Sequence, residues 1–168
     1  NLEDKWSPTA SFRALKMFLA HACRLKAHVR QLDFVGAYLK ANVRSRIFIK
    51  FPTVYAKILP EYKEYFGVPL RLLKSMYGMT LSGKYWYLEL LEGLEALGFT
   101  QSTTMRWLFY KIYPDNSVIY LLNYVDDMLY FGTSPVTVTH FETDLSSRYN
   151  LEKLGQAHWY LSTRIVQH

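Results

Sequence analysis

The sequence lacks the features that mark several large classes of protein. Its 168 residues include one cysteine, Cys23, so an internal disulfide is impossible, and five scattered histidines do not complete a zinc site. No apolar run approaches the roughly 18 residues that a membrane-spanning helix needs. No basic segment followed by an apolar stretch opens the chain, as a secretory signal would. We therefore expect no disulfide scaffold, no zinc module and no membrane contact.

What the sequence does contain is a large apolar fraction and an uneven distribution of charge. Half of the residues are hydrophobic, which is enough for a buried core, and the net charge is +6. Residues 13–50 hold nine basic residues and one acid, Asp33, so this window carries +8. Clustered positive charge favours polyanions such as nucleic acid. The alternative interpretation is a solvated helix face beside an ordinary basic strand.

Hydrophobic periodicity predicts a mixture of helices and antiparallel strands. Helices are expected at 9–27, with Ser7 or Thr9 as the cap, at 84–97 and at 136–148, and Gly98 follows the second as a C′ glycine. A short helical turn is expected at 36–41 and a loop with one short helix over 52–69. Without a strict strand–helix alternation, the fold class is α+β. The expected strands are 28–34, 46–51, 70–74, 107–113, 118–125, 128–132 and 159–166.

Two adjacent acids between apolar strands are the most informative local feature. Asp126 and Asp127 separate the predicted strands 118–125 and 128–132. If they formed only a type I′ hairpin turn, Asn-Gly or Asp-Gly would suit the positive φ angles better. Two neighbouring carboxylates also repel each other, and the apolar flanks limit their solvation. A divalent cation with oxygen ligands would compensate this pair, so Mg²⁺ binding is a second interpretation.

Asp33 strengthens the metal interpretation. It lies at the end of a predicted strand inside the basic window, 93 residues before Asp126. A strand-end carboxylate beside a hairpin-tip pair could hold two divalent ions, about 3.5–4 Å apart, of the kind that catalyse in-line phosphoryl transfer. Only a fold can bring these residues together, so this is a prediction about tertiary structure.

These residues belong to a wider pattern that resembles the reverse transcriptase of copia-type retrotransposons. The resemblance runs over nearly the whole chain, and its motifs occur in the family's order. They are Lys5-Trp6-Ser7-Pro8, then Gln31-Leu32-Asp33 with Ala37-Tyr38-Leu39, then Leu73-Lys74-Ser75-Met76-Tyr77-Gly78-Met79 with Trp86-Tyr87, then Leu97-Gly98-Phe99, then Tyr124-Val125-Asp126-Asp127-Met128-Leu129, and finally Leu154-Gly155 with Tyr160-Leu161 and Ile165.

The resemblance implies a reverse-transcriptase palm: an antiparallel sheet with an Asp-Asp hairpin, backed by helices. It implies that Asp33 and Asp126 are the principal ligands of two Mg²⁺ ions, for which Mn²⁺ can substitute. The Phe34 carbonyl would add an oxygen and Asp127 would assist, and the three aspartates would be catalytic. Tyr38 would be an aromatic gate beneath the sugar that favours deoxynucleotides, although the residue could instead be an ordinary core aromatic.

The resemblance also implies contacts with substrate, and here the sequence departs from the family. Tyr77 and Gly78 would lie beneath the templating base, and Lys84 near the incoming nucleotide. Leu81 stands where the family has a glutamine, and Lys84 lacks the bidentate fork of the usual arginine. These departures leave the metal site intact and put catalytic efficiency in doubt. The further candidates for nucleic-acid contact are the basic residues Arg44, Arg46 and Lys50.

The implied function is RNA-directed DNA synthesis by a single domain, residues 1–168. The partners would be an RNA or DNA template with its primer, and dNTPs, in an intracellular setting such as a cytoplasmic particle or the nucleus. The family's fingers strands are expected upstream of Asn1, and its thumb and RNase H downstream of His168. The isolated fragment should accordingly be weak or inactive. Three alternatives remain open, namely a catalytically decayed relic, a plain basic nucleic-acid-binding module, and an unrelated α+β interaction domain.

Overall fold

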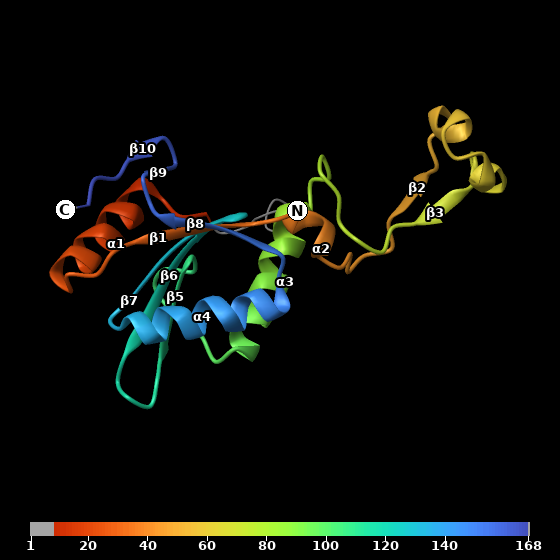
Figure 1. Cartoon of the computed structure of the whole chain (residues 1–168). Coiled ribbons are helices and arrows are strands. Elements are labelled where there is room, and N and C mark those ends of the chain that lie inside the picture. Colours follow the sequence, from red (N-terminus) through yellow and green to blue (C-terminus); the bar gives the residue numbers. More distant parts are fainter. Residues whose placement is uncertain (1–8, 168) are drawn as a thin grey trace.

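A six-stranded antiparallel sheet forms the centre of the molecule (Figure 1). The structure, a computed structural model, describes residues 9–167. The strand order is β4-β5-β6-β7-β1-β8, so β1 lies between two strands that come from much later in the chain. This mixture of helices and an antiparallel sheet confirms the predicted α+β class. The strands are β1 (Arg30–Phe34), β4 (Thr100–Gln101), β5 (Leu108–Ile112), β6 (Val118–Tyr124), β7 (Asp127–Gly132) and β8 (Leu151–Gln156).

Helices cover both faces of this sheet, because its central strands are apolar on both sides. On β6, Leu121 packs into the cluster of buried residues contributed by α3 (Ser82–Ala96) and α4 (Pro135–Arg148). The next residue, Leu122, points the other way and packs with α1 (Phe12–Arg24). Successive side chains of a strand face opposite sides, so α1 lies on one face and α3 and α4 on the other.

The helix ends agree with the predictions in part. The N-cap of α1 is Ser11, whose hydroxyl accepts a hydrogen bond from the Ala14 amide at 3.2 Å, so the prediction of Thr9 as cap is wrong. The other predicted cap, Ser7, lies outside the described residues. Gly98 has φ 81° and its amide bonds to the Glu95 carbonyl, which confirms its role just after α3.

A long arm projects from the body between α2 (Ala37–Lys40) and α3 (Figure 1). We use "the arm" for residues 46–72. It contains a two-stranded ladder of β2 (Phe48–Lys50) and β3 (Pro69–Arg71). Two 3₁₀ helices at its tip, η2 (Thr53–Lys57) and η3 (Pro60–Tyr65), replace the single short helix that was predicted.

The end of the chain differs from the prediction of one strand over 159–166. Two short strands, β9 (Trp159–Tyr160) and β10 (Thr163–Arg164), pair across a turn at Leu161 and Ser162, both with positive φ. The strand β8 was not predicted at all, because its residues are polar and mostly exposed at the edge of the sheet. It is nevertheless the strand that pairs with the outer side of β1.

Candidate functional site

The three predicted aspartates come together at one end of β1 and β7. Asp33 and Asp127 are direct partners in the antiparallel β1–β7 ladder, so their side chains lie on the same face of the sheet. Further along β7, Leu129 and Phe131 point to the same face as Asp127 and pack with buried residues of α1, whereas Met128 points to the other face. The aspartates therefore lie on the face that α1 covers. Asp126 precedes Asp127 in the turn, and its carbonyl accepts a hydrogen bond from the Phe34 amide at 3.0 Å.

The turn itself differs from the predicted one in its central residues. Tyr124 pairs with Asp127, so the two residues between the strands are Val125 and Asp126, and Asp127 already belongs to β7. Positive φ occurs at Val125 (58°) and not at Asp126, which is the pattern of a type II′ turn rather than type I′. A β-branched residue in the left-handed region is strained.

Buried contacts hold this strained turn in place. The Trp86 indole donates a hydrogen bond to the Val125 carbonyl at 2.6 Å, and the Asn123 amide group donates another at 3.4 Å. Trp86 is fully buried in α3, and its ring packs edge-on against Phe34 at 5.0 Å. The same indole therefore connects α3, the end of β1 and the turn. Sequence reasoning placed Trp86 in a motif but did not predict this contact.

Partial burial, with added charge repulsion, disfavours the ionised form of two of these acids. Partial burial raises the pKa of Asp33, and the charges of Asp126, Asp127 and Glu152 raise it further. Glu152 is the partner of Asp33 on the other neighbouring strand, β8, so Asp33 has an acid opposite it on both sides. Partial burial also raises the pKa of Asp127, opposed by a hydrogen bond that its Oδ1 accepts from the Gln31 side chain at 3.3 Å.

Gln31 and Glu152 are site residues that sequence reasoning missed. Gln31 is two positions before Asp33, so the two-residue period of a strand places both side chains on one face, and that signal was available. Glu152 could not be found in this way, because β8 was not predicted. The Tyr160 hydroxyl, 3.4 Å from the Asp127 carbonyl, is a third neighbour that only the fold brings close.

The carboxylates at this end of β1 and β7 are suitable ligands for a hard divalent cation, although they do not converge on a single point. Mg²⁺ prefers carboxylate oxygens, and a cation would offset both the burial of these charges and their mutual repulsion. Across residues 9–167, no three His, Cys, Asp or Glu side chains converge as a ready metal-binding group. The Phe34 side chain is buried against Trp86 and Tyr149, and its backbone carbonyl is the predicted donor. The metal ligands remain a prediction.

Among the other predicted residues, Tyr38 interacts electrostatically with Asp126, and Tyr77 packs against Tyr38. Tyr38, in α2, is half-buried, and its ring centroid is 5.0 Å from that of Tyr77. Burial raises the pKa of Tyr38 and the Asp126 charge raises it further, which places this hydroxyl near the turn. Tyr77 is 56% exposed, and Gly78 beside it takes φ 87°. Lys84 lies in the first turn of α3, half-buried.

The fold separates the basic residues of the 13–50 window, and the predicted contacts Arg44, Arg46 and Lys50 remain a prediction. Arg44 donates a hydrogen bond to Glu92 of α3 at 2.6 Å, so an acid already offsets part of its charge. Arg46 and Lys50 are exposed and lie in the arm, whereas α1, which carries the earlier basic residues of the 13–50 window, lies at the opposite end of the molecule (Figure 1). The +8 window is therefore split by the fold rather than gathered on one face.

Comparison with known proteins identifies the family of the chain. A family model described as reverse transcriptase (RNA-dependent DNA polymerase) matches residues 1–168. The chain is 25% identical over 167 residues to a retrovirus-related Pol polyprotein from transposon TNT 1-94 of Nicotiana tabacum, covering 99% of the chain and 12% of the relative. It is 29% and 27% identical over 159 residues to those from transposons RE2 and RE1 of Arabidopsis thaliana, covering 94% of the chain and 10% of each relative.

These matches assign the chain to a known class of domain. The chain is a member of the reverse transcriptase family, in its copia-type retrotransposon branch. It spans about a tenth of the length of these polyproteins. No solved structure matches it significantly. No helix within residues 9–167 is long and apolar enough to cross a membrane.

Proposed function

We propose that this domain is the palm of an RNA-directed DNA polymerase, which extends a DNA primer with dNTPs on an RNA or DNA template. The observation that carries the proposal is the in-register pairing of Asp33 with Asp127, one residue from Asp126, at strand ends where burial and neighbouring charges raise two pKa values. Family membership supports the reaction class, and the pairing supports the place at which it occurs.

In this proposal the aspartates hold two Mg²⁺ ions. Asp33 and Asp126 would be the principal ligands, with the Phe34 carbonyl and Asp127 assisting, and Mn²⁺ could substitute. When bound, such ions activate the primer hydroxyl and stabilise the leaving oxygen of an in-line displacement. Gln31 would orient Asp127 through the hydrogen bond to Oδ1. Trp86 would hold the turn that presents Asp126 through its bond to the Val125 carbonyl.

The residues around the aspartates would position the nucleotide and the template. Tyr38, which is near Asp126 and packs against Tyr77, would contact the sugar and exclude a 2′-hydroxyl. Tyr77 and Gly78 would lie beneath the base pair, and Lys84 would face the triphosphate. Arg44, Arg46 and Lys50 would contact nucleic acid, Arg44 more weakly because Glu92 is already its partner. We place the protein inside the cell, where its template and dNTPs occur.

Single-nucleotide addition tests this function directly. A labelled DNA primer annealed to an RNA template would be mixed with excess protein, one complementary dNTP and Mg²⁺ or Mn²⁺, in a single-turnover format. We expect slow addition that Asp126→Asn abolishes and that Asp115→Asn, at an exposed turn elsewhere, leaves unchanged. Addition that survives Asp126→Asn would overturn the proposal.

A catalytically decayed relic makes a different prediction in the same assay. Leu81 stands where the family has a glutamine. Its side chain is partly buried against the α3–α4 core and offers no hydrogen-bonding group to a nucleotide. A folded chain that binds primer–template but adds no nucleotide with either metal, even after Leu81→Gln, would favour the relic.

A further inference from the structure

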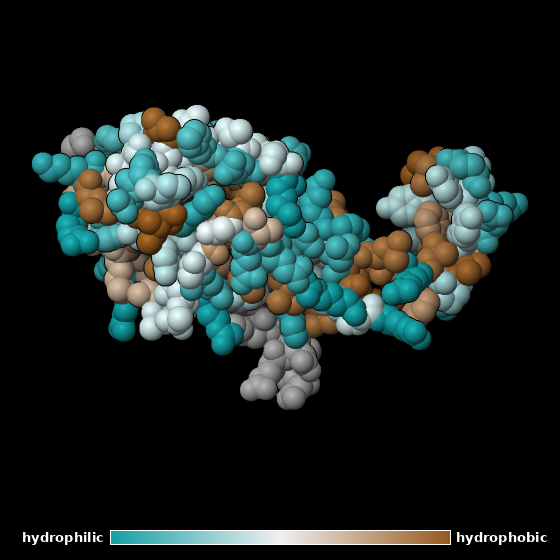
Figure 2. Space-filling model, turned by 90° about the horizontal axis from the view of Figure 1, so that it is seen from below, coloured by the Kyte–Doolittle hydropathy of each residue, from teal (hydrophilic) through white to brown (hydrophobic). Residues whose placement is uncertain are grey.

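The proposed function uses only Arg46 and Lys50 at the base of the arm and gives no role to its tip, η2 and η3. The arm stands away from the body, joined to it through the chain segments on either side of β2 and β3 (Figures 1 and 2). Only the middle residue of each strand is half-buried, and the flanking residues are exposed. Figure 2 shows hydrophobic residues along the arm, interspersed with hydrophilic ones. An element this exposed is expected to contact something other than its own core.

Aromatic rings gather at the tip of the arm without being buried there. The ring of Phe51 lies 5.4 Å from that of Phe66, 6.0 Å from that of Tyr55 and 6.4 Å from that of Tyr62, centroid to centroid. Tyr65 packs against Tyr62 at 6.3 Å. The three tyrosines nevertheless remain 40–46% exposed. Phe51 and Phe66 thus form a small apolar base on which partly exposed rings are held.

The charge of the arm is positive and not neutralised internally. Residues 46–72 contain five basic and two acidic residues. All five basic residues are exposed, and none forms an ion pair with an acid among the described residues. The two acids, Glu61 and Glu64, both lie in η3, and a hydrogen bond with Glu64 raises the pKa of Tyr65. The basic residues are Arg46, Lys50, Lys57, Lys63 and Arg71.

We propose that the arm binds single-stranded nucleic acid, with unpaired bases stacking on Tyr55 and Tyr62 and phosphates meeting Lys57 and Lys63. Single-strand binding surfaces combine positive charge that follows the backbone with aromatic side chains on which bases stack. The arm also exposes aliphatic residues such as Val54 and Ile58, which would suit a protein partner. The net positive charge of the same segment, five basic against two acidic residues, favours a polyanion with flat, apolar groups.

This inference rests on the proposed function for its choice of ligand, but not for any chemistry. In a polymerase, the strand with unpaired bases is the template ahead of the primer. The arm would therefore hold template that has not yet been copied, at a distance from the aspartates. Because stacking requires unpaired bases, the arm should prefer a single strand to a duplex of the same length.

Equilibrium binding in the presence of a chelator tests the arm independently of catalysis. Fluorescence anisotropy with labelled oligothymidylate and with a labelled duplex of equal length, at low salt, gives the two affinities. The double substitution Tyr55→Ala/Tyr62→Ala should weaken single-strand binding at least about fivefold, the lower limit expected for losing one stacked base. The control is Phe12→Ala, which removes an aromatic ring that is 53% exposed on α1.

Two further pairs of variants separate stacking from charge. Tyr55→Phe/Tyr62→Phe keeps both rings and should keep the affinity. Lys57→Gln/Lys63→Gln should weaken binding and lower the slope of log K against log salt by up to about 2, roughly one for each phosphate that the variant no longer neutralises. Lys16→Gln/Lys26→Gln, on or beside α1 at the other end of the molecule, changes the same net charge and should have a smaller effect.

Three results would overturn the proposal. The first is equally tight binding of duplex and single strand, and the second is unchanged affinity in Tyr55→Ala/Tyr62→Ala. The third is a protein that does not bind oligothymidylate but self-associates in sedimentation experiments, with the association lost in Tyr55→Ala/Tyr62→Ala. If the alanine pair does not fold, as judged by circular dichroism, Tyr55→Leu/Tyr62→Leu keeps apolar bulk and makes the same prediction. Asp126→Asn should bind oligothymidylate normally, so failure of the polymerase proposal and failure of the arm proposal remain distinguishable.

Discussion

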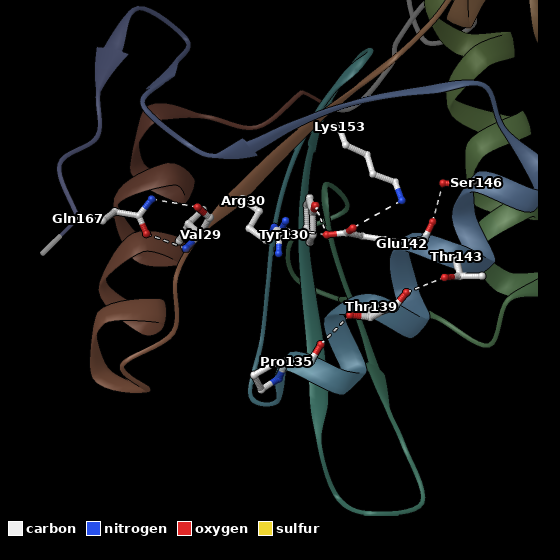
Figure 3. A network of polar contacts seen from close by, with 10 residues as sticks. All are labelled: Val29, Arg30, Tyr130, Pro135, Thr139, Glu142, Thr143, Ser146, Lys153 and Gln167. Carbon is white, nitrogen blue, oxygen red and sulfur yellow. Dashed lines mark hydrogen bonds and ion pairs between the residues drawn. The ribbon is translucent and has the colours of Figure 1, made fainter.

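Asp33 lies directly opposite Asp127 in the β1–β7 ladder, and at the other end of the same ladder Arg30 lies directly opposite Tyr130. One end is a site of repulsion between like charges, and the other is a site of attraction. The Tyr130 hydroxyl donates to Glu142 of α4 at 2.8 Å, and Arg30 and Lys153 lie 3.3 and 3.5 Å from the same carboxylate (Figure 3). The attractive end therefore joins β1, β7, β8 and α4, and it helps to maintain a register that the acidic end opposes.

Neutralising one acid should stabilise the metal-free protein. Like charges directly opposite each other on neighbouring strands cost about 0.2–1 kcal/mol, so Asp33→Asn should raise the free energy of unfolding by that amount at neutral pH. Urea denaturation measures this. Asp115→Asn is the control of opposite sign, because hydrogen bonds from Ser117 lower the pKa of Asp115 and favour its charged form. A destabilised Asp33→Asn protein would show that the repulsion is already compensated.

The raised pKa values of two aspartates give the stability a defined pH dependence. The pKa of Asp33 and that of Asp127 are raised in the folded state, so the native protein binds protons more tightly than the unfolded chain. Their contribution to the free energy of unfolding therefore falls as pH rises through these raised pKa values, and recovers as pH falls. The gain from Asp33→Asn should accordingly shrink as urea denaturation is repeated at progressively lower pH. A gain that is independent of pH would mean that charge is not its cause.

A divalent cation bound at the aspartates should stabilise the folded protein, as Asp33→Asn should in the metal-free protein. If Mg²⁺ binds only the folded protein, the free energy of unfolding rises by RT ln(1 + [L]/Kd), about 1.4 kcal/mol at ten times Kd. Thermal unfolding with and without Mg²⁺, in the presence of a dNTP, measures the shift. Asp126→Asn should remove most of it and Asp115→Asn should not. A melting temperature of the folded wild type that Mg²⁺ does not change would contradict the metal site.

Tyr38 should determine which sugar is accepted if its ring lies beneath the incoming nucleotide. In an active polymerase that contains this domain, Tyr38→Ala should increase the incorporation of ribonucleotides relative to deoxynucleotides, whereas Tyr38→Phe, which keeps the ring, should not. Competition between a ribonucleotide and its deoxy counterpart gives the ratio. Unchanged sugar selectivity in an active Tyr38→Ala enzyme would assign Tyr38 to packing against Tyr77.

The attractive end of the ladder should contribute measurably to stability. Tyr130 is fully buried, and its hydroxyl donates to a carboxylate, so Tyr130→Phe should cost about 1.5–3 kcal/mol, the usual range for a hydrogen bond to a charged group. Glu142→Ala should cost more, because it leaves the Tyr130 hydroxyl without its acceptor and Arg30 without its ion-pair partner. Urea denaturation gives both values. Thr139→Ala, one turn earlier on the exposed side of α4, is the control and should change stability little.

Much of the fold could be predicted because its elements carry local signals. The helix α3 has an apolar face with helical spacing and a glycine just after its end, and the strands β5, β6 and β7 are runs of β-forming residues separated by turn residues. The elements that were missed are those whose secondary structure depends on tertiary contacts. The strand β8 is polar and mostly exposed, and it forms because β1 offers an unpaired edge.

The candidate site divides in the same way. The sequence alone determined which acids to consider, because two adjacent carboxylates between apolar strands and one in a basic window conflict with ordinary structural roles. Only the tertiary structure decided that Asp33 is opposite Asp127, that the turn is centred on Val125 and Asp126, and that Glu152 completes a row of acids across three strands. Pairing between segments about a hundred residues apart depends on register, and register is set by packing of the whole sheet rather than by any local sequence.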